Sequence, residues 1–175
     1  MTKNDLLVQL RAARSSFVLG LASVYLLAQK ETHILLERGI GKLADYEIPF
    51  KQVAESMREP QKQEADFKNF NKFIMRAMFK DSYEVLQEYC IVTKQNSKRI
   101  AQPWHQFSRM IRNCLAHDYT FKFSDHDKKK LPVTWNDITI TADMDGAILT
   151  SDFIGPGKIL DLCQDIHSFA ENSLE

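Results

Sequence analysis

Cysteine is scarce in this sequence, and the three present do not form a framework. Cys90, Cys114 and Cys163 are odd in number, far apart and set among apolar residues. Such a set is more typical of a reducing compartment than of a disulfide scaffold, and we expect buried thiols. Cys114 and His117 have the spacing of metal ligands, but no second Cys/His pair completes a zinc site, so no metal is expected.

The chain also lacks a net charge, because 23 Lys and Arg balance 23 Asp and Glu. It therefore has no global attraction to nucleic acid or to an anionic membrane. The charge is unevenly distributed, since residues 94–130 hold nine basic and three acidic residues and the remainder carries the opposite excess. A phosphate backbone would bind most favourably there. For Lys128 to Lys130, solvation of a loop is at least as good an explanation.

Long apolar runs are missing as well. The most apolar stretch, Phe17 to Ala28, is interrupted by Gly20 and Ser23 and is shorter than the roughly 20 residues that cross a bilayer. We therefore expect a buried helix segment and no membrane partner. The first residues include Asp5 and have no basic region leading into a cleavage site, so no secretory signal is expected and a cytoplasmic location follows.

Signatures of cofactor binding are incomplete. The segment Gly39 to Lys42 lacks the longer glycine loop and the Ser/Thr of a P-loop, and Asp143 to Gly146 lacks the remaining ligands of a calcium loop. No cofactor is expected. With no repeat and no long linker, 175 residues at 44% hydrophobic content predict a single domain over residues 1–175.

Apolar residues at three- and four-residue steps predict helices over most of the chain. One runs from about 6 to 36 and ends at Gly39 and Gly41. A short helix follows Pro49 and a long one follows Pro60, since proline suits the first turn of a helix. The polar run 93–98 is the expected break, a further helix covers about 102–119, and 124–130 is an expected charged loop.

The pattern changes after residue 130. Val133 to Thr141 is rich in β-branched residues and predicts a strand, Ala142 to Gly146 a turn, and Ala147 to Phe153 a second strand. Gly155-Pro156-Gly157 then opens a last helix. The predicted fold class is mainly α, a helical bundle with one late β-hairpin at about 133–153 and a C-terminal helix.

The most informative segment is Phe107 to Tyr119, which separates into two faces on a helical wheel. One face is an apolar stripe. The other gathers the polar residues and one small residue, and on it Asn113 and His117, four residues apart, are neighbours. The apolar stripe is Phe107, Met110, Ile111, Cys114 and Leu115; the other face is Arg109, Arg112, Asn113, Ala116 and His117.

These residue types share a chemistry. Histidine can take or give a proton near neutral pH, and a guanidinium stabilises a phosphate as negative charge builds. RNA carries its own nucleophile, so if His117 deprotonated a ribose 2′-hydroxyl, Arg112 could stabilise the phosphate and Asn113 could orient the histidine or bind a phosphate oxygen. The reaction needs no metal. From periodicity alone, however, a solvated polar face is the better explanation of these residues.

Arg112-Asn113-Cys114-Leu115-Ala116-His117 resembles the Arg-x4-His signature of the HEPN superfamily. The resemblance implies an HEPN-like helical fold, a homodimer in which two motifs face each other, and one composite site that acts on RNA. It also implies a toxin, anti-phage or RNA-processing role, with an antitoxin protein as a possible partner. Catalysis would fall to Arg112, Asn113 and His117.

Further contacts follow from the same arrangement. RNA would also contact Arg109 and Lys122, and the dimer would meet at Ala116, where a small residue lets another helix approach. Two classes of function remain: a metal-independent endoribonuclease, and a non-catalytic HEPN-like dimer that binds RNA or another protein. Intact Arg112 and His117 favour the ribonuclease.

Overall fold

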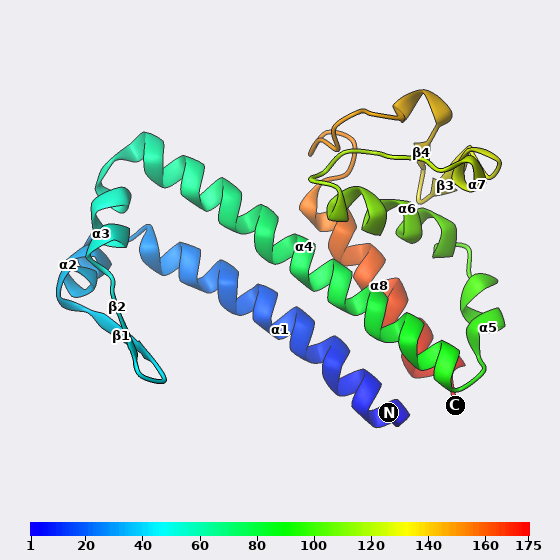
Figure 1. Ribbon diagram of the computed structural model, residues 1–175, viewed down its shortest axis with the longest axis horizontal. Coiled ribbons are helices and arrows are strands. Elements are labelled where there is room, and N and C mark those ends of the chain that lie inside the picture. Colours follow the sequence, from blue (N-terminus) through cyan, green and yellow to red (C-terminus); the bar gives the residue numbers. More distant parts are fainter. The chain divides into compact units, whose positions relative to one another are not determined.

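The computed structural model describes all residues from 1 to 175 and is mainly α-helical, as predicted. It divides into two compact units. Unit 1 comprises residues 1–14 and 75–175, and unit 2 comprises residues 15–74. Two long helices, α1 (Lys3–Leu27) and α4 (Pro60–Val92), contribute to both units (Figure 1).

Unit 2 contains the second part of α1, then α2 (Lys30–Arg38), a hairpin of β1 (Ile40–Leu43) and β2 (Tyr46–Pro49), α3 (Lys51–Arg58) and the first part of α4. The prediction of one continuous helix over residues 6–36 is therefore wrong, because α1 ends at Leu27 and α2 begins at Lys30. The His33 imidazole lies 2.9 Å from the Leu27 carbonyl oxygen, which the helix end leaves without a helical partner. The hairpin was not predicted, because Gly39 and Gly41 were interpreted as a helix end only.

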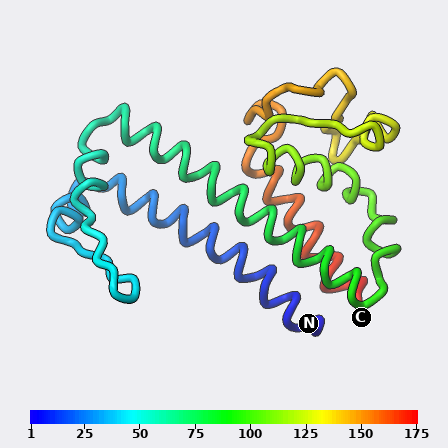
Figure 2. The backbone as a smooth tube through the Cα atoms, in the orientation of Figure 1, coloured from blue at the N-terminus to red at the C-terminus, as the bar shows by residue number.

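Unit 1 contains the start of α1, the second part of α4, α5 (Asn96–Ile100), α6 (His105–Ala116), α7 (Asp125–Lys128), a hairpin of β3 (Val133–Trp135) and β4 (Ile138–Ile140), a 3-10 turn (Ala142–Met144) and α8 (Pro156–Ser173). The helices after Pro49 and Pro60 and the C-terminal helix are confirmed. Figure 2 traces the chain from α6 through residues 117–155 to α8. Fully buried core side chains include Phe79, Leu86, Phe107, Ile111, Leu115, Ile159, Leu162 and Ile166.

The late hairpin is shorter than the predicted 133–153. Trp135 pairs directly with Ile138, and the two residues between them, Asn136 and Asp137, have positive φ values of 44° and 65°. This is the geometry of a tight type I′ turn, which Asn and Asp tolerate. The second predicted strand, 147–153, is wrong: only Ile148 forms a bridge, and its partner is Thr120.

Two further boundaries differ from the sequence prediction. The break after α4 is confirmed at Lys94, whose φ is 59°, but a helix resumes at Asn96, inside the expected break. The predicted loop 124–130 holds α7, because Ser124 and Asp127 form a reciprocal capping box at its start.

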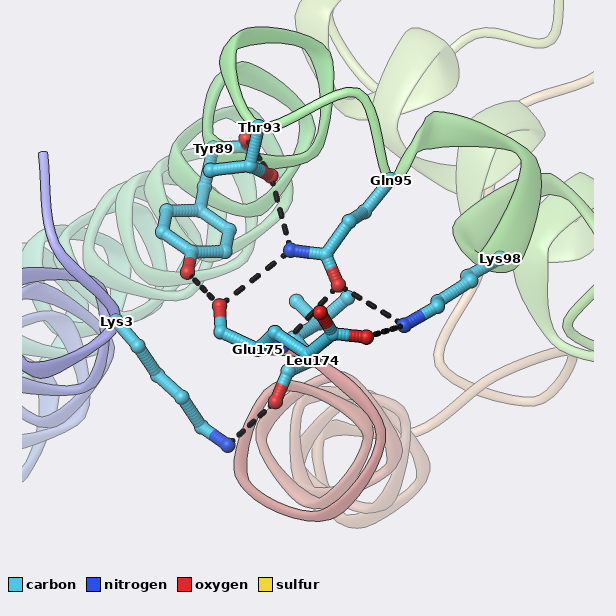
Figure 3. A network of polar contacts seen from close by, with 7 residues as sticks. All are labelled: Lys3, Tyr89, Thr93, Gln95, Lys98, Leu174 and Glu175. Atoms are coloured by element: carbon cyan, nitrogen blue, oxygen red, sulfur yellow. Dashed lines mark hydrogen bonds and ion pairs between the residues drawn. The ribbon is translucent and has the colours of Figure 1, made fainter.

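The last residues are fixed to several elements of unit 1 (Figure 3). The Lys3 ammonium donates to the Leu174 carbonyl oxygen at 2.5 Å. The Glu175 amide donates to the Gln95 side chain at 3.1 Å, and the Glu175 carboxylate pairs with Lys98 at 2.8 Å. These contacts join the end of α8 to α1 and to the start of α5 within unit 1.

The apolar segment in α1 is not buried as predicted. Leu19 and Tyr25 are both 69% exposed and Leu26 is 56% exposed. By length and composition alone, α1 meets the requirement for a helix that crosses a membrane; core helices and N-terminal signals meet the same requirement. The prediction of buried thiols is confirmed for Cys90 and Cys114, whereas Cys163 is half-buried.

Candidate functional site

The helix α6 carries the motif and buries the predicted apolar stripe. Phe107, Ile111 and Leu115 are fully buried, and Met110 and Cys114 are nearly so. The Phe107 and Trp135 ring centroids lie 5.5 Å apart, a contact between α6 and β3. Figure 1 shows α6 beside the β3–β4 hairpin. With this side buried, the opposite side of α6 is the only one that can present the motif residues.

Arg112 is held by two neighbours. Its Nη2 pairs with the Glu84 carboxylate of α4, and its Nη1 donates to the Asn113 side-chain oxygen at 3.2 Å. Lys80, one turn earlier on α4, lies 3.9 Å from the same carboxylate. The Arg112 and Glu84 side chains are 32% and 40% exposed, so an incoming anion can reach the guanidinium. An ion pair this exposed contributes about 1 kcal/mol or less, and exchanging Glu84 for a phosphate oxygen costs little.

His117 does not extend the polar face of α6 as predicted. The helix ends at Ala116, and His117 adopts φ −104° and ψ 47°. Its backbone amide still donates to the carbonyl oxygens of Asn113 and Cys114, both at 3.1 Å. The side chain is exposed at the helix end, with no hydrogen bond to Arg112 or Asn113. The structure thus joins the Arg112 and Asn113 side chains by a hydrogen bond, whereas the His117 side chain forms none with either.

The chain turns sharply after His117. Asp118 and Tyr119 have φ values of 52° and 62°, the left-handed region that non-glycine residues seldom occupy. The Tyr119 carbonyl oxygen accepts a hydrogen bond from Leu149 at 2.6 Å, and Phe121 donates to Ala147 at 2.9 Å. These bonds hold the turn in place.

Arg109 has a different setting from Arg112. It pairs with the Asp127 carboxylate of α7, and the two side chains are 25% and 5% exposed. Asp127 also accepts from the Ser124 hydroxyl at 2.6 Å, within the capping box of α7. The predicted RNA contact at Arg109 thus falls on a residue that already neutralises a buried carboxylate.

The remaining predicted residues lie on the surface. Ala116 and Lys122 are both exposed, on either side of the turn at 118–119. Arg76 of α4 adds a cation near that turn, since it lies 3.5 Å from the Asp118 carboxylate. Neither Arg76 nor Glu84 was predicted, because the sequence places them 42 and 28 residues away from their partners.

His105, the other histidine of α6, is unsuited to acid–base work. Burial, with the nearby charges of Arg99, Arg109 and Lys130, lowers the pKa of its imidazole to about 4. The side chain is therefore neutral at physiological pH, and its Nε2 is buried without a hydrogen-bond partner. His117 remains as the exposed histidine of the motif.

Burial likewise makes the thiols poor nucleophiles. It raises the pKa of Cys114 and of Cys163 to about 12 and raises that of Cys90. Thiolates are then rare at neutral pH, which argues against nucleophilic or metal-binding roles for these residues. Comparison of the chain with protein-family models, with curated proteins and with solved structures gives no match.

Proposed function

We propose that this chain is an endoribonuclease of the HEPN class, in which Arg112, Asn113 and His117 cleave RNA without a metal ion. The observation that carries the proposal is the setting of the motif. Arg112 is fixed by Asn113 and Glu84 at a solvent-accessible position, and His117 stands exposed just beyond the helix end, on an anchored turn. An accessible guanidinium and an exposed imidazole are groups that can promote RNA cleavage.

The proposed reaction is internal transesterification. The His117 imidazole removes the proton from a ribose 2′-hydroxyl, and the 2′-oxygen attacks the adjacent phosphorus. The bond from phosphorus to the 5′-oxygen breaks, and that oxygen leaves with a proton from a second, protonated imidazole. The products are a 2′,3′-cyclic phosphate and a 5′-hydroxyl, so no other reactant is consumed. Arg112 stabilises the charge that builds on the phosphate.

A second imidazole is supplied if two copies meet. Acid–base catalysis needs a proton acceptor and a proton donor at once, whereas one motif has a single exposed histidine. In an isologous homodimer that meets near Ala116, two His117 and two Arg112 side chains would surround one phosphate. Lys122 is then the proposed contact to flanking phosphates, because Arg109 is paired with Asp127. A cytoplasmic toxin or anti-phage effector, restrained by an antitoxin protein, would suit this activity.

The non-catalytic alternative also has an observation in its favour. Glu84 neutralises Arg112 in the free chain, which suits a module that binds RNA or protein without cutting it. The two functions differ in one outcome, because only the ribonuclease breaks the phosphodiester.

The test is an RNA cleavage assay in excess chelator with wild type, His117→Ala and His126→Ala. His126 is also exposed and lies on α7, so it is the matched control. We expect wild type and His126→Ala to cleave and His117→Ala to lose detectable cleavage. Cleavage by His117→Ala at the wild-type rate would remove His117 from the mechanism, and no cleavage by any of the three would favour the binding module.

A further inference from the structure

Unit 2 exposes many more large apolar side chains than it buries. Of the 20 exposed large hydrophobic residues of the chain, 14 lie in residues 15–74, whereas only 4 of the 29 buried hydrophobic residues lie there. The buried four are Phe17, Ala54, Met57 and Ile74. The exposed set is Val18, Leu19, Leu21, Tyr25, Leu26, Ile34, Leu35, Ile40, Leu43, Tyr46, Ile48, Val53, Phe70 and Phe73.

The exposed apolar side chains are distributed over α1, α2, β1, β2, α3 and α4. Each of the 14 side chains is at least 38% exposed, and together they present on the order of 1,000 Å². A standard interface removes about 800 Å² from each partner, and single patches beyond a few hundred Å² on a monomer commonly mark interaction sites. Those residues of the set that lie side by side on one helix can therefore contribute to such an interface.

The most regular part of the surface lies on α1. Ser15, Leu19, Ala22 and Leu26 are spaced by four, three and four residues, so they form one line along the helix, and all four are exposed. We refer to these four residues as the α1 seam. On a helical wheel the seam lies opposite Gly20, where a Cβ would come within 2.8 Å of the Ile74 side chain. At Gly20, α1 thus approaches α4 closely, while the seam residues are exposed.

The α1 seam is complementary to a second copy of itself. Its residues alternate small and large, and in an antiparallel pair centred between Gly20 and Leu21, Leu19 meets Ala22 and Leu26 meets Ser15. Each large side chain then faces a small one, the arrangement that lets helices interdigitate. A parallel pair would instead place Leu19 against Leu19 and Ala22 against Ala22, which leaves gaps between the helices.

The charge distribution of unit 2 is also compatible with a second copy of the chain as the partner. Residues 15–74 carry eight basic and eight acidic residues, and none falls between Ser15 and Gln29. A surface without net charge gives no electrostatic attraction to anionic lipid or to nucleic acid.

We propose that two copies of this chain associate through the α1 seam, with their α1 helices antiparallel across a two-fold axis near Gly20 and Leu21. This interface differs from the proposed contact at Ala116, rests on unit 2 alone and holds whether or not the chain cleaves RNA. It is isologous, so each copy contributes the same residues.

Sedimentation velocity tests the interface directly. The double substitution Leu19→Glu/Leu26→Glu places four buried charges in the dimer, so we expect it to sediment at half the mass of wild type with unchanged helix content by circular dichroism. The matched control is Ile91→Glu/Val92→Glu on α4 of unit 1, whose residues are 55% and 64% exposed, and it should sediment as wild type. Equal masses for wild type and the seam variant would overturn the proposal, as would a monomeric wild type that floats with lipid vesicles.

Disulfide crosslinking tests whether the two helices are antiparallel, and it remains informative if the charged variant fails to fold. Chains carrying Leu19→Cys, mixed with chains carrying Ala22→Cys, should form a crosslinked dimer on mild oxidation, far more than Leu19→Cys alone. The native thiols interfere little, because the pKa values of Cys114 and Cys163 are raised to about 12. Efficient crosslinking of Leu19→Cys alone would indicate a parallel pair, and its absence in all mixtures would exclude the seam. RNA cleavage plays no part in either readout.

Discussion

Replacing Arg112 by alanine is expected to lower RNA cleavage roughly 100- to 1,000-fold, the effect of losing one fixed group that stabilises transition-state charge. The fold should tolerate the change, because the Arg112 and Glu84 side chains are 32% and 40% exposed and such a pair contributes about 1 kcal/mol or less. Single-turnover cleavage and urea unfolding of the same preparations separate the two effects. A loss of activity that follows a loss of stability would assign Arg112 a structural role.

Glu84→Gln provides the matched control for Arg112→Ala. It removes the same ion pair but leaves the guanidinium and its hydrogen bond to Asn113 in place. If Arg112 acts on phosphate, this variant should keep cleavage and bind RNA more tightly, because a competing negative charge is gone. If both variants lose cleavage equally, the ion pair itself is what the activity needs, and the proposed role of Arg112 is wrong.

Asp127→Ala is expected to destabilise the protein by about 3–5 kcal/mol, because it leaves the largely buried Arg109 guanidinium without its counter-ion. Asp127 is 4% exposed and also caps α7 through Ser124, so two stabilising contacts are lost together. The measurement is the free energy of unfolding in urea. Removing both charges with Arg109→Leu/Asp127→Leu should recover much of the loss, since no unpaired charge remains. A change below about 1 kcal/mol for Asp127→Ala would show that the pair is solvated.

The sequence predicts those parts of the fold that local signals control. Pro60 marks the start of α4 and the Gly155-Pro156-Gly157 segment marks the start of α8, because proline and glycine restrict the backbone directly. The tight turn at Asn136 and Asp137 also has a local signal, and it was missed because the run of β-branched residues continues through it. The break between α1 and α2 has no such signal, since Ala28 and Gln29 stand there in place of a proline or glycine.

The candidate site is predictable only in part for a related reason. Periodicity along α6 places Arg112 and Asn113 on its polar side and buries Phe107 and Ile111, because these relations lie within one helix. Glu84 pairs with Arg112 across 28 residues, which requires the tertiary packing of α4 against α6. The end of the helix at Ala116 has no glycine to mark it, because Asp118 and Tyr119 take the left-handed conformation instead.

The most direct test of the proposed function compares two substrates of the same sequence, an RNA and its fully 2′-O-methylated form, in excess chelator with wild-type protein. Attack by the 2′-hydroxyl is the step that His117 is proposed to start, and methylation removes the proton that it would take. We expect the RNA to be cleaved to fragments that end in a 2′,3′-cyclic phosphate, and the methylated strand to remain intact. Cleavage of both strands, or RNA fragments that end in a 3′-hydroxyl, would contradict it.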